Sequence, residues 1–458
     1  MKNLSTPVSI QSLAAFRIMF GLLLVWDCWR FVKYDRIARY WADPQVLFPY
    51  PGFGWVTPLP EPYLTGLWIG MGVAAAMVAV GLFYRVASVA LLVIFSYFFL
   101  LDRAEYLNHF YLVILFAALL AVMPAHRAWS LDAWLRPGLR SDTVPYAAPF
   151  MLRAQMEIML IYAGLVKLTP DWLAGQPLEL WLRGADNPGP FGFLFAYDWF
   201  FPLASWGVIA LHVLGAPLLM WKRTRLAVFL VYCAFHISNS FYFNIGIFPW
   251  MTIAATTIFF APDWPGRLLG RASAPAPATR RLPGAVLAVM ALWLAVQIAL
   301  PVRGAMFDSD IRWSGEGHRF SWRMRIYDRD AFGSFLVTAR TADGTPDQVW
   351  LIDPYHYLTA RQTGKMMTRA DMIHAFAAHL EREYRAEGYA DIEVRADIWK
   401  SLNGRPYQQF IDPTVDLTAV QNHPLRRNDW ILPLQVPVWG ARDGNARDWD
   451  DPSPEDEV

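Results

Sequence analysis

The amino-acid sequence predicts a polytopic α-helical membrane protein of about nine spans, followed by a small α+β domain on the extracytoplasmic side. Of its 458 residues, 55% are hydrophobic and only 17% are charged, whereas a soluble globular chain carries about 25% charged residues. The apolar residues gather in stretches long enough to cross a bilayer. The last third of the chain instead shows the shorter periodicities of strands and one amphipathic helix.

The predicted spans begin close to the N-terminus. The first apolar run is longer than the core of a signal peptide and has no small-x-small cleavage site, so we interpret it as a membrane span. The third, seventh and eighth stretches are marginally short, which suggests tight hairpins or broken helices. The predicted spans are residues 10–32, 63–83, 86–101, 107–125, 147–168, 199–221, 226–243, 244–261 and 282–301.

The loops predict the orientation through their basic residues, because lysine and arginine concentrate on the cytoplasmic side of membrane proteins. A cytoplasmic N-terminus places most of the loop charges inside, and an odd number of spans then places the C-terminal region outside. We therefore expect an integral membrane protein, with the lipid bilayer as its surroundings and its C-terminal domain outside the cytoplasm. The cytoplasmic set is Lys2, Arg85, Arg127, Arg136, Arg140, Lys222, Arg223, Arg225, Arg267, Arg271, Arg280 and Arg281.

The sequence divides into three parts: a transmembrane domain at 1–301, an α+β domain at 302–447, and an acidic, disordered tail at 448–458. A Pro/Ala-rich linker at 272–281 precedes the last span. In the α+β domain, Asn403-Gly404 predicts a hairpin turn. The predicted strands are 318–327, 334–341, 349–353, 391–401 and 407–411, and the predicted helix is 369–385.

Polar residues inside the apolar stretches are the candidates for function, because each is costly in a bilayer. Lys167 closes the fifth span just before a Pro-Asp-Trp turn, and it either snorkels to the interface, forms a pair or does chemistry. Arg153 and Glu157 are four residues apart and can form an ion pair. Asp27 and Arg30 are expected to pair at the interface.

Two further polar groups stand out. Asn108-His109 opens the fourth span, where a capping asparagine followed by an interfacial histidine is the simplest interpretation. His236 and Asn239 lie in the seventh span, where hydrogen bonding between helices competes with a functional role. His212 stands alone in the sixth span, which favours packing.

Other classes of function lack support. A net charge of +1 gives no electrostatic reason to expect nucleic acid as a partner. The sequence has no metal-binding, Walker-type or G-x-S-x-G motif, so no metal is predicted. A lysine, two histidines and several asparagines among aromatic residues suit a flat lipophilic ligand such as a quinone.

The motifs resemble the vitamin K-dependent gamma-glutamyl carboxylase family, in the form of a short, bacterial-type member with an HTTM-like membrane domain. The resemblance runs in one order from about residue 10 to 435. Its motifs are Ala163-Gly-Leu-Val-Lys-Leu-Thr-Pro-Asp-Trp172, Leu107-Asn-His-Phe-Tyr111, Phe235-His-Ile-Ser-Asn-Ser240, Ile245-Gly-Ile-Phe248, Asp397-Ile-Trp-Lys-Ser-Leu-Asn-Gly-Arg405 and Phe410-Ile-Asp-Pro-Thr-Val-Asp416, with weaker support from Phe16-Arg-Ile-Met-Phe-Gly21 and Gly81-Leu-Phe-Tyr-Arg85.

The resemblance implies a coupled reaction. Vitamin K hydroquinone, or menaquinol, is deprotonated and meets dioxygen, and a strongly basic oxygenated intermediate removes the gamma proton of a glutamate in a peptide or protein. Carbon dioxide then adds to the carbanion. The resemblance assigns the first base to Lys167, the adjoining catalytic pair to Asn108 and His109, and quinone binding to His236 and Asn239 with Asn108 and Lys167.

The substrate residues match the family less closely. Trp350-Leu-Ile-Asp-Pro354 falls near the family's glutamate-binding segment, which makes Trp350 and Asp353 candidates, and Arg323 or Arg325 can pair with the substrate carboxylate. Animal members have a second lysine where this chain has Val166, and they carry an extracytoplasmic disulfide and a longer C-terminal region. The alternatives are a quinone epoxidase with a non-Glu acceptor and a non-catalytic quinone- or lipid-binding protein.

Overall fold

The computed structural model describes residues 3–185, 189–243, 245–270, 281–341 and 348–436. The chain forms two compact units. Unit 1 comprises Met1–Asp43, Pro49–Leu165 and Ile209–Ala299, and unit 2 comprises Pro44–Phe48, Val166–Val208 and Leu300–Val458. Lys167 therefore belongs to the unit that contains the C-terminal region. The predictions for the linker at 272–281 and the tail at 448–458 lie almost entirely outside the described residues.

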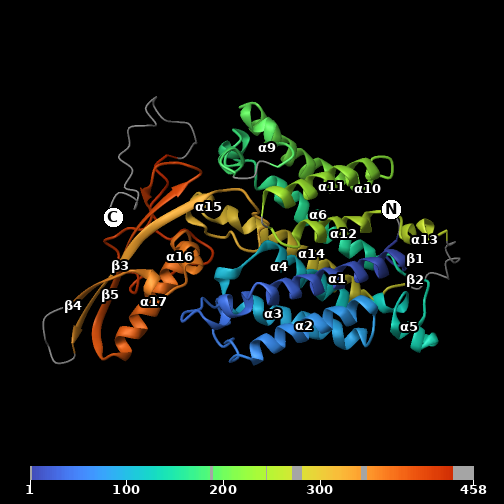
Figure 1. The fold of residues 1–458 in the computed structure, drawn as a ribbon, viewed down its shortest axis with the longest axis horizontal. Coiled ribbons are helices and arrows are strands. Elements are labelled where there is room, and N and C mark those ends of the chain that lie inside the picture. Colours follow the sequence, from blue (N-terminus) through green and yellow to red (C-terminus); the bar gives the residue numbers. More distant parts are fainter. Residues whose placement is uncertain (1–2, 186–188, 244, 271–280, 342–347, 437–458) are drawn as a thin grey trace. The chain divides into compact units, whose positions relative to one another are not determined.

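Unit 1 is helical, with one small antiparallel pair of strands near the start of its first helix. In Figure 1, α1, α2 and α3 run side by side in the blue part of the chain. The longer elements are β1 (Pro7–Ser9), α1 (Gln11–Lys33), α2 (Tyr63–Val80), α3 (Tyr84–Leu101), α4 (Asn108–Val122), β2 (Thr143–Pro145), α6 (Ala147–Leu165), α10 (Ala216–Met220), α11 (Arg225–Tyr242) and α12 (Phe248–Thr256), and α9 (Phe200–Ala210) and α14 (Gly284–Val302) cross the boundary between the units. The short elements are η1 (Ala38–Ala42), η2 (Arg103–Glu105), η3 (Ala125–Arg127), α5 (Leu131–Leu135), η4 (Pro137–Leu139), η6 (Leu211–Gly215), η7 (Thr257–Phe259) and α13 (Trp264–Leu268).

Among the described residues, five helices are long and apolar enough to cross a membrane: Gln11–Lys33, Tyr63–Val80, Tyr84–Leu101, Phe200–Met220 and Gly284–Met306. The prediction of nine spans is thus not confirmed. The other four predicted spans are helical, but α4 and the helix at Phe248–Phe259 are short, and α6 and α11 carry charged or polar side chains. An apolar run in the sequence does not distinguish a full span from a shorter buried helix.

Small residues let the first two helices approach closely. A Cβ at Gly21 of α1 would lie 2.7 Å from the Ala75 carbonyl oxygen and from Ala79 Cβ of α2, so only glycine fits there. Small residues play this role widely in membrane helices. One turn earlier, the buried Arg17 donates to the carbonyl oxygens of Ala79, Ala125, Ala128 and Trp129. One guanidinium thus satisfies the carbonyls that end α2 and follow α4.

The two expected ion pairs of unit 1 have different outcomes. Asp27 and Arg30 pair at 3.3 Å, as predicted. The predicted pair of Arg153 with Glu157 is wrong, because Arg153 instead donates to the carbonyls of Ile258 and Phe260 at 2.7 and 2.9 Å. Those carbonyls close the end of a neighbouring helical segment and need donors, so they compete successfully with a carboxylate on the same helix.

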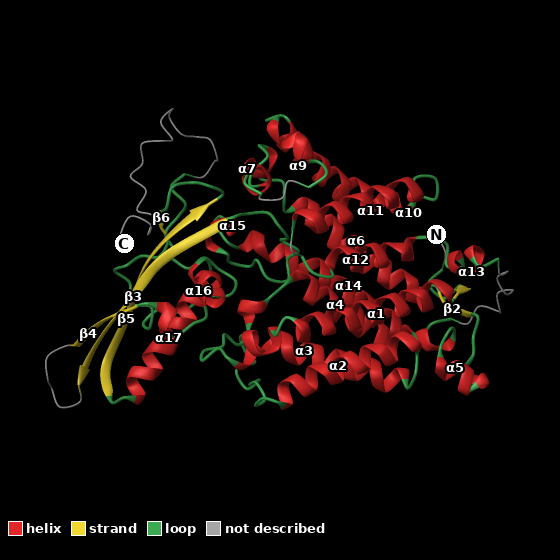
Figure 2. Ribbon diagram, in the orientation of Figure 1, coloured by secondary structure: helices red, strands yellow, loops and turns green. Residues whose placement is uncertain are grey.

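Unit 2 is an α+β fold around a four-stranded antiparallel sheet of order β4-β3-β5-β6. Figure 2 shows the long strands β3 and β5 side by side, with α16 and α17 next to them. The elements are α7 (Pro170–Leu173), α8 (Leu178–Arg183), η5 (Gly192–Ala196), η8 (Arg303–Met306), α15 (Ile311–Ser314), β3 (Arg329–Thr341), β4 (Gln348–Ile352), η9 (Pro354–His356), α16 (Ala360–Met367), α17 (Ala370–Ala386), β5 (Tyr389–Leu402) and β6 (Gln408–Gln409).

Buried and exposed residues alternate along β5, and the buried ones form part of the core of unit 2. Ile392, Val394 and Ala396 are buried while the residues between them are more exposed, as expected for a strand with one covered face. Helix α17 supplies the cover, and its Phe376 meets Phe335 of β3 edge-on at 5.0 Å between ring centroids. The predicted helix and the strands around β3, β4 and β5 are therefore confirmed, whereas α16 was not predicted.

The backbone turns of unit 2 confirm one prediction and overturn another. Asn403 and Gly404 have φ of +53° and +71°, the paired positive values of a tight hairpin turn, and β5 and β6 pair on either side of it. The strand predicted at 318–327 is wrong, because Phe320, Trp322 and Arg325 all have positive φ and the segment forms turns. Its aromatic residues imitate the composition of a strand, while their backbone conformations cannot form one.

Candidate active site

Lys167 lies in a short turn between two helices of different length. Helix α6 ends at Leu165, and α7 begins at Pro170, whose fixed φ suits the first turn of a helix. Thr169 caps α7 by accepting a hydrogen bond from the Trp172 backbone N–H at 3.3 Å. The lysine therefore sits in a constrained turn beyond the end of α6.

The ammonium group of Lys167 is held inside unit 2. The residue is 5% exposed, its Nζ donates to the Met324 carbonyl oxygen at 3.1 Å, and it lies 5.2 Å from the ring centroid of Trp172. Burial lowers the pKa of Lys167 to about 7, because the charged form loses its hydration. Near neutral pH, a large fraction of this amine is therefore unprotonated and able to accept a proton.

The carbonyl that holds Lys167 belongs to the strained segment at 320–325. Phe320, Trp322 and Arg325 have φ of +60°, +55° and +47°, values that bulky side chains rarely adopt. Trp322 is 1% exposed, and the Ser321 hydroxyl donates to the Gly317 carbonyl at 2.8 Å, so packing and local bonds maintain this backbone. Strained conformations of this kind cluster at functional sites.

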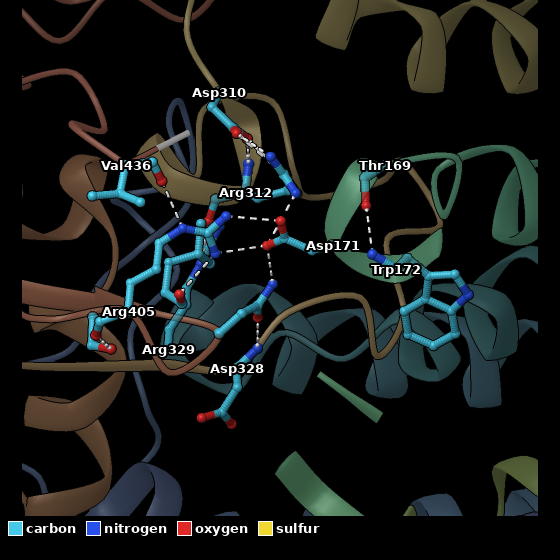
Figure 3. A network of polar contacts seen from close by, with 12 residues as sticks. Thr169, Asp171, Trp172, Asp310, Arg312, Asp328, Arg329, Arg405 and Val436 are labelled. Atoms are coloured by element: carbon cyan, nitrogen blue, oxygen red, sulfur yellow. Dashed lines mark hydrogen bonds and ion pairs between the residues drawn. The ribbon is translucent and has the colours of Figure 1, made fainter. Parts of the chain in front are cut away.

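A buried network holds the turn that follows Lys167 (Figure 3). Asp171, which is 0% exposed, accepts hydrogen bonds from both terminal nitrogens of Arg405 at 2.7 and 2.8 Å and from Asn403 Nδ2 at 2.7 Å. Arg312 adds an ion pair at 3.3 Å. Burial by itself raises the pKa of Asp171, but Arg405, Arg312 and Asn403 together hold it below its usual value. The carboxylate therefore stays ionised inside the unit.

The network continues to Asp328, three residues after the strained segment, and to α15. The Asn403 side-chain oxygen accepts from the Asp328 backbone N–H at 2.8 Å, and Arg312 pairs with Asp310 at 2.6 Å. Charge-assisted, bidentate bonds of this kind fix geometry as well as supplying energy. The hairpin turn at 403–405, the turn after Lys167 and the residues after 327 are consequently fixed to one another.

Unit 1 contains a second group of polar residues, in an aromatic setting. His109 of α4 and His236 of α11 each lie 6.0 Å from the ring centroid of Phe248. Tyr232 stacks on His236 at 6.1 Å, and Phe235 lies 5.1 Å from it. Three helices thus bring two of the predicted residues next to one aromatic ring.

His236 is the unusual member of this group. Its side chain is 1% exposed, and neither ring nitrogen has a hydrogen-bond partner among the described residues. A buried polar atom without a partner needs an explanation, and a ligand that fills the aromatic surroundings supplies one. Asn239 lies three residues further along α11 and hence on a similar face of the helix.

Asn108 does not cap its helix, contrary to the simplest interpretation of the sequence. Leu107 occupies the capping position, and the Asn108 side-chain oxygen accepts a hydrogen bond from the Tyr106 hydroxyl at 3.0 Å. The amide group of Asn108 is therefore oriented by a tyrosine two residues earlier.

Two comparisons with known families bear on these residues. Residues 5–264, more than half of the chain, match the family model of the HTTM domain. Residues 283–436 match the model of the vitamin K-dependent gamma-carboxylase lumenal domain. The chain belongs to the vitamin K-dependent gamma-carboxylase family. It is accordingly an integral membrane protein with a lumenal domain, and no solved structure matches it.

The carboxylase family uses vitamin K hydroquinone, and the residues around His236 fit such a group. Tyr232, Phe235 and Phe248 offer flat apolar surfaces, and the His236 nitrogens offer hydrogen-bonding capacity that no described residue takes up. Among the described residues, no cluster of three histidine, cysteine or carboxylate side chains is arranged to hold a metal ion.

The predicted substrate residues have different surroundings. Arg325 adjoins Met324 in the strained segment and places its guanidinium 5.4 Å from the ring centroid of Trp181. Trp350 of β4 packs on Tyr384 and Tyr389 at 4.7 and 4.9 Å, while Asp353 caps η9. Of the three, Arg325 is the one that the chain places beside the Lys167 contact.

The sequence did not predict several residues that surround Lys167 and hold its turn. Asp171 and Arg405 lie within the family motifs without a predicted role, and Asn403 was predicted only as a turn residue. Met324 contacts Lys167 through its backbone carbonyl. The available signal was the presence of one acidic and one basic residue in two motifs far apart in the chain. Nothing in the sequence paired them, because their contact depends on the fold of unit 2.

Proposed function

We propose that this carboxylase-family protein couples the oxygenation of a reduced naphthoquinone, vitamin K hydroquinone or menaquinol, to carboxylation of glutamate side chains in a polypeptide. The observation that carries the proposal is the buried Lys167 amine, held 3.1 Å from the Met324 carbonyl oxygen with a pKa lowered to about 7. A neutral amine at that position can act as the first base.

In this proposal, each part of the chain has one task. Lys167 accepts a hydroquinone proton at Nζ, while the Met324 carbonyl accepts the hydrogen bond that orients the amine. Asn108, His109, His236 and Asn239 would hold the hydroquinone through hydrogen bonds. When bound, the hydroquinone supplies with dioxygen a base strong enough to remove a glutamate gamma proton, and carbon dioxide adds to the carbanion.

The acceptor is held by the lumenal domain in this proposal. Arg325 pairs with the carboxylate of the substrate glutamate, for which a planar guanidinium is well suited. The segment that carries it also carries the Met324 carbonyl, so binding of the acceptor and orientation of Lys167 depend on the same backbone. Trp350 packs against Tyr384 and Tyr389, so we do not propose that it contacts the substrate.

The topology belongs to the same proposal. A cytoplasmic N-terminus and an extracytoplasmic lumenal domain would let secreted or surface polypeptides reach Arg325 after they have crossed the membrane. The excess of lysine and arginine in the loops on one side supports this orientation.

The test uses the purified full-length protein in nanodiscs with vitamin K hydroquinone, oxygen, labelled bicarbonate and a Glu-rich peptide. We expect quinone epoxide and peptide-bound label to rise together, and mass spectrometry to find the mass of one carbon dioxide on glutamate. Epoxide without label would favour an epoxidase with another acceptor. Quinone binding without either product would favour a non-catalytic binding protein.

A further inference from the structure

The sheet of unit 2 has an incomplete edge next to β4. Strand β4 pairs with β3 only from Phe335 to Ala339, whereas β5 pairs with β3 from Arg329 onward on the opposite side. On the β4 side, residues 329–334 of β3 therefore have no partner strand among the described residues (Figure 2). An edge of this kind is a template for another extended chain.

A cavity of about 330 Å³ lies at this edge. Its wall includes residues 331–334, together with Leu351, Tyr355 and Met367. Glycine at 333 is required, because its φ is +149° and a Cβ would lie 2.0 Å from the Asp397 carbonyl oxygen. β3 can thus lie close against β5 while its other edge stays open to the cavity.

A second cavity, of about 550 Å³, shares Leu351 and Asp353 with the first. Its wall also contains Glu383, which pairs with His379 at 3.3 Å. Among the described residues, two carboxylates and no lysine or arginine line the two cavities. Leu351 stands between them and is 74% exposed, although apolar side chains on an edge strand are usually covered or replaced by charged ones.

We propose that this edge binds an extended segment of the acceptor polypeptide, which adds to β3 beyond the end of β4. The segment places an apolar side chain in the cavity beside Leu351 and a lysine or arginine near Asp353 and Glu383. This inference depends on the proposed function in one respect, namely that the acceptor is a polypeptide. Strand addition supplies affinity through the main chain, and pockets beside the strand supply specificity.

The charge of the cavities favours a basic acceptor segment over the acidic C-terminal tail of the chain itself. Residues 448–458 contain six acidic residues and no basic one, so the carboxylates that line the cavities repel them. A basic segment meets the opposite sign, and complementary charge favours correct encounters over wrong ones. The edge therefore selects for a feature of the polypeptide that is separate from the glutamate to be carboxylated.

The experiment measures binding of a fluorescein-labelled peptide, Thr-Thr-Leu-Thr-Lys-Thr-Glu-Glu-Thr, to the full-length protein in nanodiscs. We expect at least about tenfold weaker binding when glutamate replaces the lysine or when alternate backbone nitrogens are methylated, a change of about 1.4 kcal/mol. We expect the same loss in Leu351→Arg. Val349→Arg is the matched control, because Val349 is 60% exposed on the same strand but lines neither cavity.

Charge removal gives a second variant. Asp353→Asn combined with Glu383→Gln should bind the lysine and glutamate peptides within about twofold of each other, because asparagine can still cap η9. The inference is overturned by absent peptide binding, by equal effects of Leu351→Arg and Val349→Arg, or by insensitivity to methylation. Tighter binding after deletion of 448–458 would assign the edge to the tail, and a dimer lost in Leu351→Arg would assign it to a second copy.

Peptide binding is measured without turnover, so a failure of the docking inference can be distinguished from a failure of the proposed function. Lys167→Ala should bind the peptide like the wild-type protein even if it forms no product. Epoxide formation with no peptide binding would leave the proposed base chemistry intact and overturn the docking edge alone.

Discussion

The buried carboxylate of Asp171 makes a demanding prediction, because it lies only four residues after the proposed base. In Asp171→Asn, the Arg405 guanidinium keeps its buried position, and its charge partner is gone. Both side chains are at most 1% exposed. Breaking a buried pair in this way costs roughly 3–5 kcal/mol. The turn that carries Lys167 would lose its attachment to Asn403 and Arg405, so turnover should fall with stability.

The assay is chemical unfolding of the purified protein, followed by tryptophan fluorescence, together with epoxide formation at a temperature where the variant is folded. Asp198→Asn is the control: Asp198 pairs with Arg183 at 2.6 Å, but its side chain is 91% exposed, so stability should be almost unchanged. Combining Asp171→Asn with Arg405→Gln should cost less than the sum of the single changes. Equal stability of Asp171→Asn and Asp198→Asn would refute the reasoning.

Three further predictions concern the base, the quinone residues and the topology. Because burial lowers the pKa of Lys167 to about 7 and the neutral amine is the active form, kcat/KM for epoxidation should rise with pH around 7 and level off above it; a rise that continues toward pH 10 would contradict this. His236→Leu should raise the KM for hydroquinone about tenfold by removing a polar partner, while His126→Leu, a buried histidine stacked on Tyr84, should leave this KM unchanged. A C-terminal reporter should be active only outside the cytoplasm, and cytoplasmic activity would reverse the predicted orientation.

The lowered pKa of Lys167 also makes the stability of the fold depend on pH. Its ordinary value of 10.5 applies to the unfolded chain, whereas the folded value is about 7. Between these two pH values the unfolded chain binds the extra proton, so stability rises with pH across this window. Lys167→Met should remove that part of the pH dependence, which stability measurements from pH 7 to 10 would detect.

The sequence predicted those parts of the fold that depend on local pattern. The alternation in β5, the apolar face of α17 and the Asn403-Gly404 turn are all readable from neighbouring residues, and all are present. The strand predicted at residues 318–327 is absent, because Phe320 and Trp322 are residue types common in strands but adopt positive φ. Such strain is maintained by tertiary packing and leaves no local signature.

The candidate site residues could be predicted from the sequence for a different reason. Lys167, His109 and His236 are polar residues in apolar surroundings, which makes them conspicuous in a membrane protein. The residues around them could not be predicted from the sequence. Met324 contacts Lys167 through a backbone carbonyl, which every residue type has, and Asp171 pairs with Arg405, which is far away in the sequence. The Arg153–Glu157 pair failed because helical spacing allows a contact without excluding other acceptors, such as the Ile258 and Phe260 carbonyls.

The central claim is that the Lys167 amine is the base that begins turnover. The most direct measurement is epoxide formation by wild-type protein and Lys167→Ala at saturating hydroquinone, with and without a small primary amine, alongside hydroquinone binding. We predict a loss of about 10²–10⁴-fold in the variant, unchanged binding, and partial recovery with the amine. Wild-type turnover in Lys167→Ala, or a loss that follows weaker hydroquinone binding and does not respond to the amine, would contradict the account.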